Sequence, residues 1–235
     1  SIMYANNEIG SIQDIKTLCK IAHKYGAYFH TDAVQAIGNI KVDVVDLDID
    51  ALSLSSHKFY GPKGVGALYV KKGISFEALI HGGSQEKSKR AGTENVAGIV
   101  GLGKAIEIAD ENCENNVKKY VGFREKIISE IVEKNSDIFI NGDIDNRLAN
   151  NLNLYIKNVN NSQLVTMLDM ENIFVSGGSA CHSGSSNPSH VIMALFNDEK
   201  IANSSIRITF GKYNTEKEIE VFIKKLQSII IKLRK

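Results

Sequence analysis

A histidine and a lysine stand side by side in the turn 55–64, which reads Ser-Ser-His-Lys-Phe-Tyr-Gly-Pro-Lys-Gly. Short apolar runs at 51–54 and 65–70 predict a strand on either side of this turn. A lysine at the end of a buried strand can lose solvent, which weakens the preference of its amine for the charged form and suits it to Schiff-base chemistry. His57 and Lys58 could equally be ordinary loop residues, and the turn alone leaves both interpretations open.

A second polar group, Asp32 with Gln35, follows the strand-like run 27–32. A pyridoxal phosphate enzyme needs a lysine for the Schiff base, a carboxylate beside the pyridine nitrogen, donors for the phosphate and a group near the ring hydroxyl. Residues of the required types are present: Lys58, Asp32, Ser55, His57 and Gln35. An aspartate at a strand end is about as often structural, so this chemistry is a hypothesis.

Cys181 lies in a glycine- and serine-rich stretch, 176–187. A free cysteine is most often a small buried hydrophobe, but the polar neighbours here lack apolar periodicity and favour an exposed, reactive thiolate. His182 could lower the pKa of that thiol or simply be exposed. Cys19 occupies an apolar helix position and is predicted to be a core residue, whereas Cys113 lies among polar residues and is predicted to be exposed.

The elements that would position these side chains alternate between strand and helix. The apolar patterns predict a helix over 14–26, capped by Asp14 and Gly26, and strands at 1–5, 27–32 and 50–54. This order predicts a mainly parallel α/β sheet, in which ligands bind beyond the carboxyl ends of the strands. Asn7, Asp32 and the 55–58 group all follow such ends.

The pattern changes near residue 115, which predicts domains at 1–114 and 115–235. The second domain is predicted to be α+β, with helices at 117–134, 162–171, 187–195 and 215–233 and strands at 152–156, 173–176 and 205–210. Alternation in the last strand places Ile206, Ile208 and Phe210 on one face and Arg207 on the other. Thr215 and Glu218 have the spacing of a capping box.

The composition is globular, with 43% hydrophobic and 23% charged residues. The net charge is +1, so no nucleic-acid or membrane-surface partner is expected. No apolar run approaches the ~18 residues of a membrane helix. Three widely spaced cysteines predict neither a disulfide framework nor a metal site, and they favour a reducing, cytoplasmic location.

Several strings occur together in one order and resemble the cysteine desulfurases, a branch of the class V aminotransferase-like, fold type I pyridoxal phosphate enzymes. The strings are Ala-Asn-Asn-Glu-Ile-Gly (5–10), His-Thr-Asp-Ala-Val-Gln (30–35), Ser-His-Lys-Phe-Tyr-Gly-Pro-Lys-Gly (56–64), Arg-Ala-Gly-Thr (90–93) and Gly-Ser-Ala-Cys (178–181). The resemblance implies the later part of a cofactor-binding large domain, with a mainly parallel sheet, followed by a smaller α+β domain. The family's full chain is longer, so a fragment is expected.

The resemblance also implies a role for each residue. Lys58 would be the Schiff-base lysine and would move the Cα proton of the substrate, and Cys181 would be the nucleophile. Five further residues would complete the cofactor site: Asp32 at the pyridine nitrogen, Gln35 and Asn7 near the ring hydroxyl, and Ser55 and His57 at the phosphate. Arg207 would bind the substrate carboxylate, with Asn7 nearby. Thr93 would reach the phosphate of a partner subunit, which implies a homodimer.

The implied function is conversion of L-cysteine to L-alanine with a persulfide left on Cys181. That sulfur would pass to an acceptor such as an iron–sulfur scaffold or a tRNA-thiolation protein. Two alternatives stay open. One is another class V enzyme, such as a selenocysteine lyase or an aminotransferase. The other is an inactive truncated chain that serves as a dimerisation or sulfur-carrier binding module.

Overall fold

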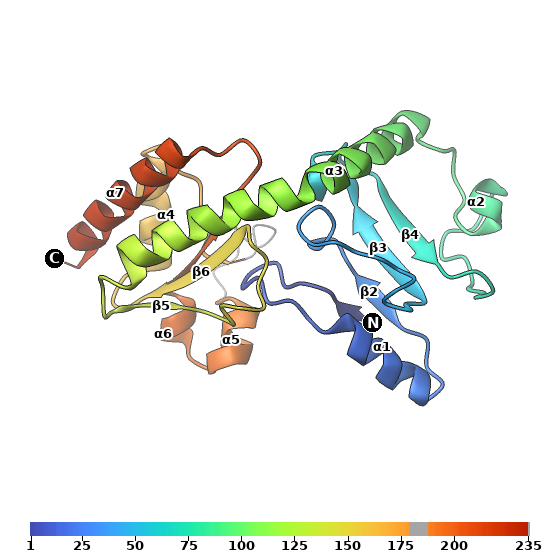
Figure 1. Cartoon of the computed structure of the whole chain (residues 1–235), viewed down its shortest axis with the longest axis horizontal. Helices are drawn as coiled ribbons and strands as arrows, with labels where there is room; N and C mark the ends of the chain where they lie inside the picture. Colours follow the sequence, from blue (N-terminus) through green and yellow to red (C-terminus); the bar gives the residue numbers. More distant parts are fainter. Residues whose placement is uncertain (179–187, 235) are drawn as a thin grey trace. The chain divides into compact units, whose positions relative to one another are not determined.

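A computed structural model describes residues 1–178 and 188–234 of the chain. These residues form two compact units: residues 1–4 with 13–113, and residues 5–12 with 114–235. Figure 1 shows the elements of each unit along the chain. The predicted domains, 1–114 and 115–235, differ from these units in two respects: the short segment 5–12 and residue 114 both belong to the second unit.

The first unit is built on a four-stranded sheet in the order β1-β2-β3-β4. The first three strands are parallel and β4 is antiparallel to β3, so the prediction of a mainly parallel α/β sheet is confirmed. Its elements are β1 (Ile2–Met3), α1 (Ile15–Lys24), β2 (His30–Asp32), β3 (Ala51–Ser55), the 3₁₀ helix η1 (Ser56–Phe59), β4 (Gly66–Val70) and α2 (Gln85–Ser88).

Helix α1 begins and ends as its sequence predicts. The Asp14 side chain accepts a hydrogen bond from the Thr17 amide at 3.1 Å, and Ile15 and Cys19 are buried. Gly26 follows the helix at φ +70°, a backbone conformation that glycine adopts without strain. The helix therefore packs an apolar face that contains Cys19, as predicted.

The second unit is built on an antiparallel sheet in the order β5-β6-β7. Its elements are the later part of α3 (Val96–Ile127), the π-helical turn η2 (Ile128–Val132), β5 (Ile138–Ile140), β6 (Asn151–Ile156), α4 (Asn161–Asp169), α5 (His190–Phe196), α6 (Glu199–Ala202), β7 (Ser205–Thr209) and α7 (Glu216–Leu233).

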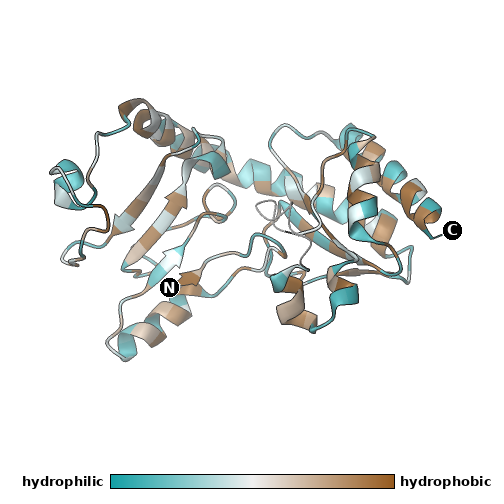
Figure 2. Ribbon diagram, turned by 180° about the vertical axis from the view of Figure 1, so that it is seen from behind, coloured by the Kyte–Doolittle hydropathy of each residue, from teal (hydrophilic) through white to brown (hydrophobic). Residues whose placement is uncertain are grey.

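The main core of this unit lies between the sheet and the helices α3, α4 and α7. Leu152, Leu154 and Ile156 alternate along β6 and are fully buried in it. Ile206 and Ile208 on β7 join the same core, as their alternation predicts. In Figure 2, apolar and polar residues alternate along α7, the helix at the C-terminus, and its buried positions face this core.

Three local predictions for the second unit are wrong, and one strand was missed. The helix predicted to begin at 117 is the later part of α3, which is continuous from Val96 to Ile127. Strand β5 was not predicted because it has only three residues, of which Phe139 is exposed. Residues 173–176 make one isolated bridge, from Ser176 to Arg207, in place of a strand. Helix α5 begins at His190, capped by Ser189, and the predicted start at 187 lies outside the described residues.

Candidate active site

Two predicted site residues lie at the carboxyl edge of the parallel strands in the first unit. Asp32 is the last residue of β2 and pairs in register with Ser53, while Ser55 is the last residue of the neighbouring β3. Parallel strands bring their carboxyl ends to one edge, so the side chains of Asp32 and Ser55 project from the same edge of the sheet. Asp32 Oδ1 accepts the Val34 amide at 2.9 Å, which folds the chain into a tight turn after β2.

The turn after β3 presents His57 and Lys58 to solvent. In the 3₁₀ helix η1, Ser56 and Phe59 are three apart and share the buried side, so the two residues between them point outward. A hydrogen bond of 2.9 Å joins Ser55 Oγ to His57 Nδ1. The amine of Lys58 is exposed and has no hydrogen bond or ion pair to any described residue. Lys58 was expected to be shielded from solvent, but in this structure it is exposed.

Gly61 lets the turn pack closely on itself and against helix α3. A Cβ atom at Gly61 would lie 2.0 Å from Ser56 Oγ and 2.9 Å from the Cβ of Ala105, so a larger residue does not fit. The residue before it, Tyr60, has a φ of +69° and closes the 3₁₀ helix. The turn therefore presents the exposed side chains of His57 and Lys58 from a closely packed backbone.

The remaining predicted residues of the first unit have fewer contacts. Gln35 is half-buried, three residues beyond Asp32, and its backbone oxygen accepts the Asn39 side chain at 3.1 Å. Thr93 is exposed in the segment that precedes α3. His30, two residues before Asp32, has a pKa below its usual value, chiefly because burial disfavours the imidazolium. The positive Ser1 amine adds to this shift.

Asn7 and Arg207 lie together in the second unit. The guanidinium Nη1 of Arg207 donates to the backbone oxygen of Asn7 at 3.1 Å. The backbone of Arg207 exchanges two hydrogen bonds with Ser176, at 2.6 and 3.1 Å. Ser176, the first residue of the stretch 176–187 that contains Cys181, is therefore paired directly with Arg207, the predicted carboxylate-binding residue.

Glu8 is a buried acid, near both flanks of the segment that contains Cys181, that sequence reasoning missed. Its side chain is 1% exposed, and its Oε2 accepts a hydrogen bond from Ser189 Oγ at 2.5 Å. The string 5–10 is mostly polar, and polar loops are normally solvated. Two signals were available: the single acid of that loop, and a serine at 189 with the spacing of an N-cap before an apolar run.

Cys181 and His182 lie outside the described residues, and so the reactive role of Cys181 stays a prediction. The residues that flank the segment are described. Ser176 Oγ donates to Gly178 O at 2.8 Å, and Ser189 caps α5 through its bond to the Ile192 amide at 3.2 Å. Both flanks of the segment that contains Cys181 therefore belong to the second unit.

The other two cysteines are buried. Cys19 is a core residue as predicted, and burial raises the pKa of its thiol, with further contributions from Asp50 and Asp48. Cys113 is 9% exposed, so the prediction that it is exposed is wrong. It lies one helical turn beyond Ala109, whose side chain packs near Gly38, and the continuous helix α3 therefore turns it inward.

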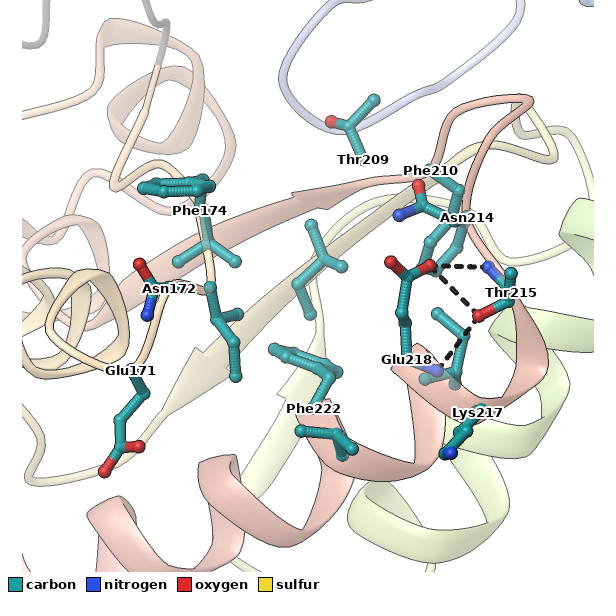
Figure 3. Close-up of a pocket in the computed structure, with 15 residues that line it drawn as sticks. Glu171, Asn172, Phe174, Thr209, Phe210, Asn214, Thr215, Lys217, Glu218 and Phe222 are labelled. Carbon is teal, nitrogen blue, oxygen red and sulfur yellow. Dashed lines mark hydrogen bonds between the residues drawn. The ribbon is translucent and has the colours of Figure 1, made fainter.

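A hollow of about 680 Å³ lies in the second unit beside β7 and α7. Figure 3 shows its apolar wall, with Phe174 and Phe222, and the polar cap formed by Thr215 and Glu218. None of the predicted site residues lines it. Among the described residues, no three His, Cys, Asp or Glu side chains are grouped closely enough to hold a metal ion. Nor has any helix in these ranges the length and apolar character needed to cross a membrane.

The donor set in the first unit fits pyridoxal phosphate chemically. Ser55 and His57 offer hydrogen-bond donors to an anionic phosphate, Asp32 keeps its second carboxylate oxygen without a described partner, and Lys58 offers an unpaired amine. All four follow two adjacent parallel strands, where ligands of such sheets bind.

Comparisons with known proteins agree with this chemistry. Residues 1–222 match the family model described as "Aminotransferase class-V". The chain is 50% identical over its full length to a protein of Dictyoglomus turgidum named cysteine desulfurase IscS, and covers 59% of it. It is 46% identical to one of the same name from Methanosarcina thermophila, of which it covers 58%.

Solved structures give the same result. A NifS-like protein from Rickettsia africae superimposes with a TM-score of 0.88 and 35% identity, over 97% of this chain and 60% of that one. The chain thus spans about 59% of the length of the curated relatives it matches. The family model covers nearly all of the sequence and the fold agrees, and so this chain belongs to the class V aminotransferases, a family of pyridoxal phosphate-dependent enzymes.

Proposed function

We propose that this chain acts in a cysteine desulfurase, which takes sulfur from L-cysteine and leaves L-alanine. One observation carries the proposal: the side chains that suit the cofactor meet at the carboxyl edge of β2 and β3. The similarity to proteins named cysteine desulfurase, at 50% and 46% identity, supports this choice among class V enzymes.

In this proposal the first unit holds the cofactor. Ser55 and His57 bind its phosphate, Asp32 faces its pyridine nitrogen, and Gln35 approaches its ring hydroxyl. Bound pyridoxal phosphate supplies an electron sink for chemistry at the substrate Cα. The Lys58 amine carries the cofactor and moves the proton at that Cα. Because Lys58 is exposed and unpaired here, nothing in the described residues must be broken for this amine to react.

The second unit contributes the groups that act on the rest of the substrate. Arg207 binds the cysteine carboxylate, for which a planar guanidinium is suited, and Asn7 lies beside it. The Cys181 thiolate attacks the substrate sulfur. A sulfur–sulfur bond forms as the substrate carbon–sulfur bond breaks, the carbon takes a proton, and the products are alanine and a persulfide on Cys181. Atoms and electrons balance with no added oxidant.

The setting of the reaction is part of the proposal. Thr93 contacts the cofactor phosphate of a second copy, so the active protein is a homodimer. The persulfide sulfur passes to an acceptor protein of iron–sulfur cluster assembly or tRNA thiolation, in the cytoplasm.

Cofactor binding and sulfur release test the two halves of the proposal separately. The purified chain, incubated with pyridoxal phosphate, should gain a visible absorbance band that Lys58→Ala abolishes. Sulfide release from L-cysteine in the presence of a thiol reductant should then vanish in Cys181→Ser and persist in Cys113→Ala, which removes a buried cysteine.

Each negative outcome has a distinct meaning. A chain without the absorbance band would act as a binding module in place of an enzyme. Sulfide release that persists in Cys181→Ser would indicate another class V activity, such as that of a selenocysteine lyase or an aminotransferase.

A further inference from the structure

The backbone of Glu8 is fixed from two directions within the second unit. The Asn6 side chain accepts hydrogen bonds from the amides of Glu8 and Ile9, at 2.8 and 3.0 Å. The backbone oxygen of Glu8 accepts from the side-chain amides of Asn151 and Asn153, both at 3.1 Å. These two asparagines lie on the face of β6 opposite the main core, and so the strand itself sets the direction in which the Glu8 side chain points.

The Glu8 carboxylate lies between the two ends of the segment 179–187. On one side, its Oε2 accepts the short bond from Ser189 Oγ. On the other, Oε2 lies 3.8 Å from the position that a Cβ of Gly178 would occupy. One buried carboxylate therefore accepts a bond from a residue just after the segment and lies near the residue before it.

The same network includes the proposed carboxylate-binding arginine. Arg207 donates to the oxygen of Asn7, the residue before Glu8, and its backbone pairs with Ser176. Ser176 in turn donates to Gly178 O at 2.8 Å. Hydrogen bonds thus connect Arg207 to both flanks of the segment through groups that are at least partly buried.

A buried carboxylate is an unusual choice for this position. An ionised group loses its hydration on burial, and a glutamine of the same shape could accept the same bond. A bond to an ionised acceptor is, however, about twice as strong as a neutral one and holds its donor more tightly.

We infer that Glu8 is a positioning residue for sulfur transfer: through its bond to Ser189, and from its place near Gly178, it holds the flanks of the segment that contains Cys181 relative to Arg207. This inference rests on the proposed function. Glu8 exchanges no proton or atom with the substrate. Its effect belongs to the step in which Cys181 takes the sulfur, and substrate and cofactor binding do not depend on it.

The test compares Glu8→Gln, Ser189→Ala and Ser189→Thr with the matched control Ser162→Ala, an exposed serine in the first turn of α4. Glu8→Gln and Ser189→Ala should lower kcat for sulfide release about tenfold, the effect of one charge-assisted hydrogen bond. The KM for cysteine and the cofactor absorbance band should not change. Ser189→Thr keeps the hydroxyl and should restore most of kcat.

Unchanged kcat in both Glu8→Gln and Ser189→Ala would overturn the inference. Equal losses in kcat, cofactor band and thermal stability would also overturn it, because they would indicate a general structural role. The split between kcat and KM, with rescue by threonine, is the result that only a positioning role produces.

A second readout separates this inference from the proposed function. The rate at which iodoacetamide alkylates Cys181, measured by peptide mass spectrometry, requires no enzymatic activity. Glu8→Gln should change this rate beyond the scatter of the Ser162→Ala control, and an unchanged rate would contradict the positioning role. If the parent chain releases no sulfide but the alkylation rate responds to Glu8→Gln, the proposed function fails, and what remains is that Glu8 holds the segment that contains Cys181.

Discussion

Arg207 and Asn7 are 200 positions apart in the chain and are joined by a 3.1 Å hydrogen bond from the guanidinium to a backbone oxygen. Two residues that the sequence assigned to one substrate therefore meet in the second unit, although one comes from its β7 strand and the other from the short segment 5–12.

Arg207→Lys should weaken substrate binding more than catalysis. A lysine keeps the positive charge but loses the planar fork, so it cannot hold both Asn7 O and a carboxylate in the same geometry. We expect the KM for cysteine to rise about ten- to a hundredfold, with a smaller change in kcat. Steady-state sulfide release measures both constants. A KM within twofold of the parent value would contradict the assignment of Arg207.

Leu226→Ala tests the core of the second unit. Leu226 is fully buried on α7, and its truncation should lower the free energy of unfolding by about 2–5 kcal/mol. Ile231→Ala is the matched control on the same helix, since Ile231 is 59% exposed and should change stability by less than about 0.5 kcal/mol. Urea titrations followed by circular dichroism give both values. Equal losses would mean that α7 does not pack as the structure has it.

The α7 capping box should respond to pH. Glu218 Oε2 accepts bonds from the Thr215 amide at 2.7 Å and the Thr215 hydroxyl at 3.1 Å, as Figure 3 shows, and these bonds lower the pKa of Glu218 below its usual 4.5. A carboxylate with a lowered pKa stabilises the fold above pH 4.5, and this stabilisation is lost as pH falls through the folded-state pKa.

The stability difference between the parent chain and Glu218→Gln should therefore be constant from neutral pH to about 5 and shrink at lower pH. Chemical denaturation at a series of pH values measures it, with Glu216→Gln in the same turn as the control. A difference that grew on acidification would contradict the capping interaction.

Arg147 should be dispensable for stability although it is 5% exposed. Its Nη2 donates to Asn141 O, but Nε and Nη1 have no partner among the described residues, and no described carboxylate lies within ion-pair distance. Burial, with a smaller effect of the nearby Arg124 charge, lowers the pKa of Arg147 to about 10. The charged form thus destabilises the folded chain at neutral pH.

Replacing buried ion pairs with well-packed apolar side chains of similar volume is often neutral or stabilising by about 1–4 kcal/mol, and a buried charge without a carboxylate partner offers less Coulombic stabilisation to lose. Arg147→Met should follow this behaviour in urea titrations, with the partly exposed Arg234→Met as the control. A loss of stability of several kcal/mol would show that the guanidinium has a partner that stabilises it.

The sequence predicted the features that depend on local patterns. Alternation along 205–210 gave the inward face of β7, and the Thr215–Glu218 spacing gave the cap of α7. The strand-end positions of Asp32 and Ser55 followed from the order of strands and helices.

Features that depend on distant contacts could not be predicted. The attachment of segment 5–12 to the second unit rests on Asn151 and Asn153, which bind Glu8 from more than a hundred residues away. The inward turn of Cys113 requires that α3 continue through a run of polar residues, and no local pattern in that run predicts this. The burial of Glu8 also depends on distant contacts, because Asn151 and Asn153 bind its backbone oxygen.

The proposed reaction is tested most directly by the location of the transferred sulfur. The chain is incubated with pyridoxal phosphate and L-cysteine without reductant, alkylated and digested, and the cysteine peptides are analysed by mass spectrometry. The proposal predicts one additional sulfur atom on the peptide that contains Cys181, absent from Lys58→Ala, and none on the peptides of the buried Cys19 and Cys113. Alanine formed without sulfur on Cys181 would contradict it.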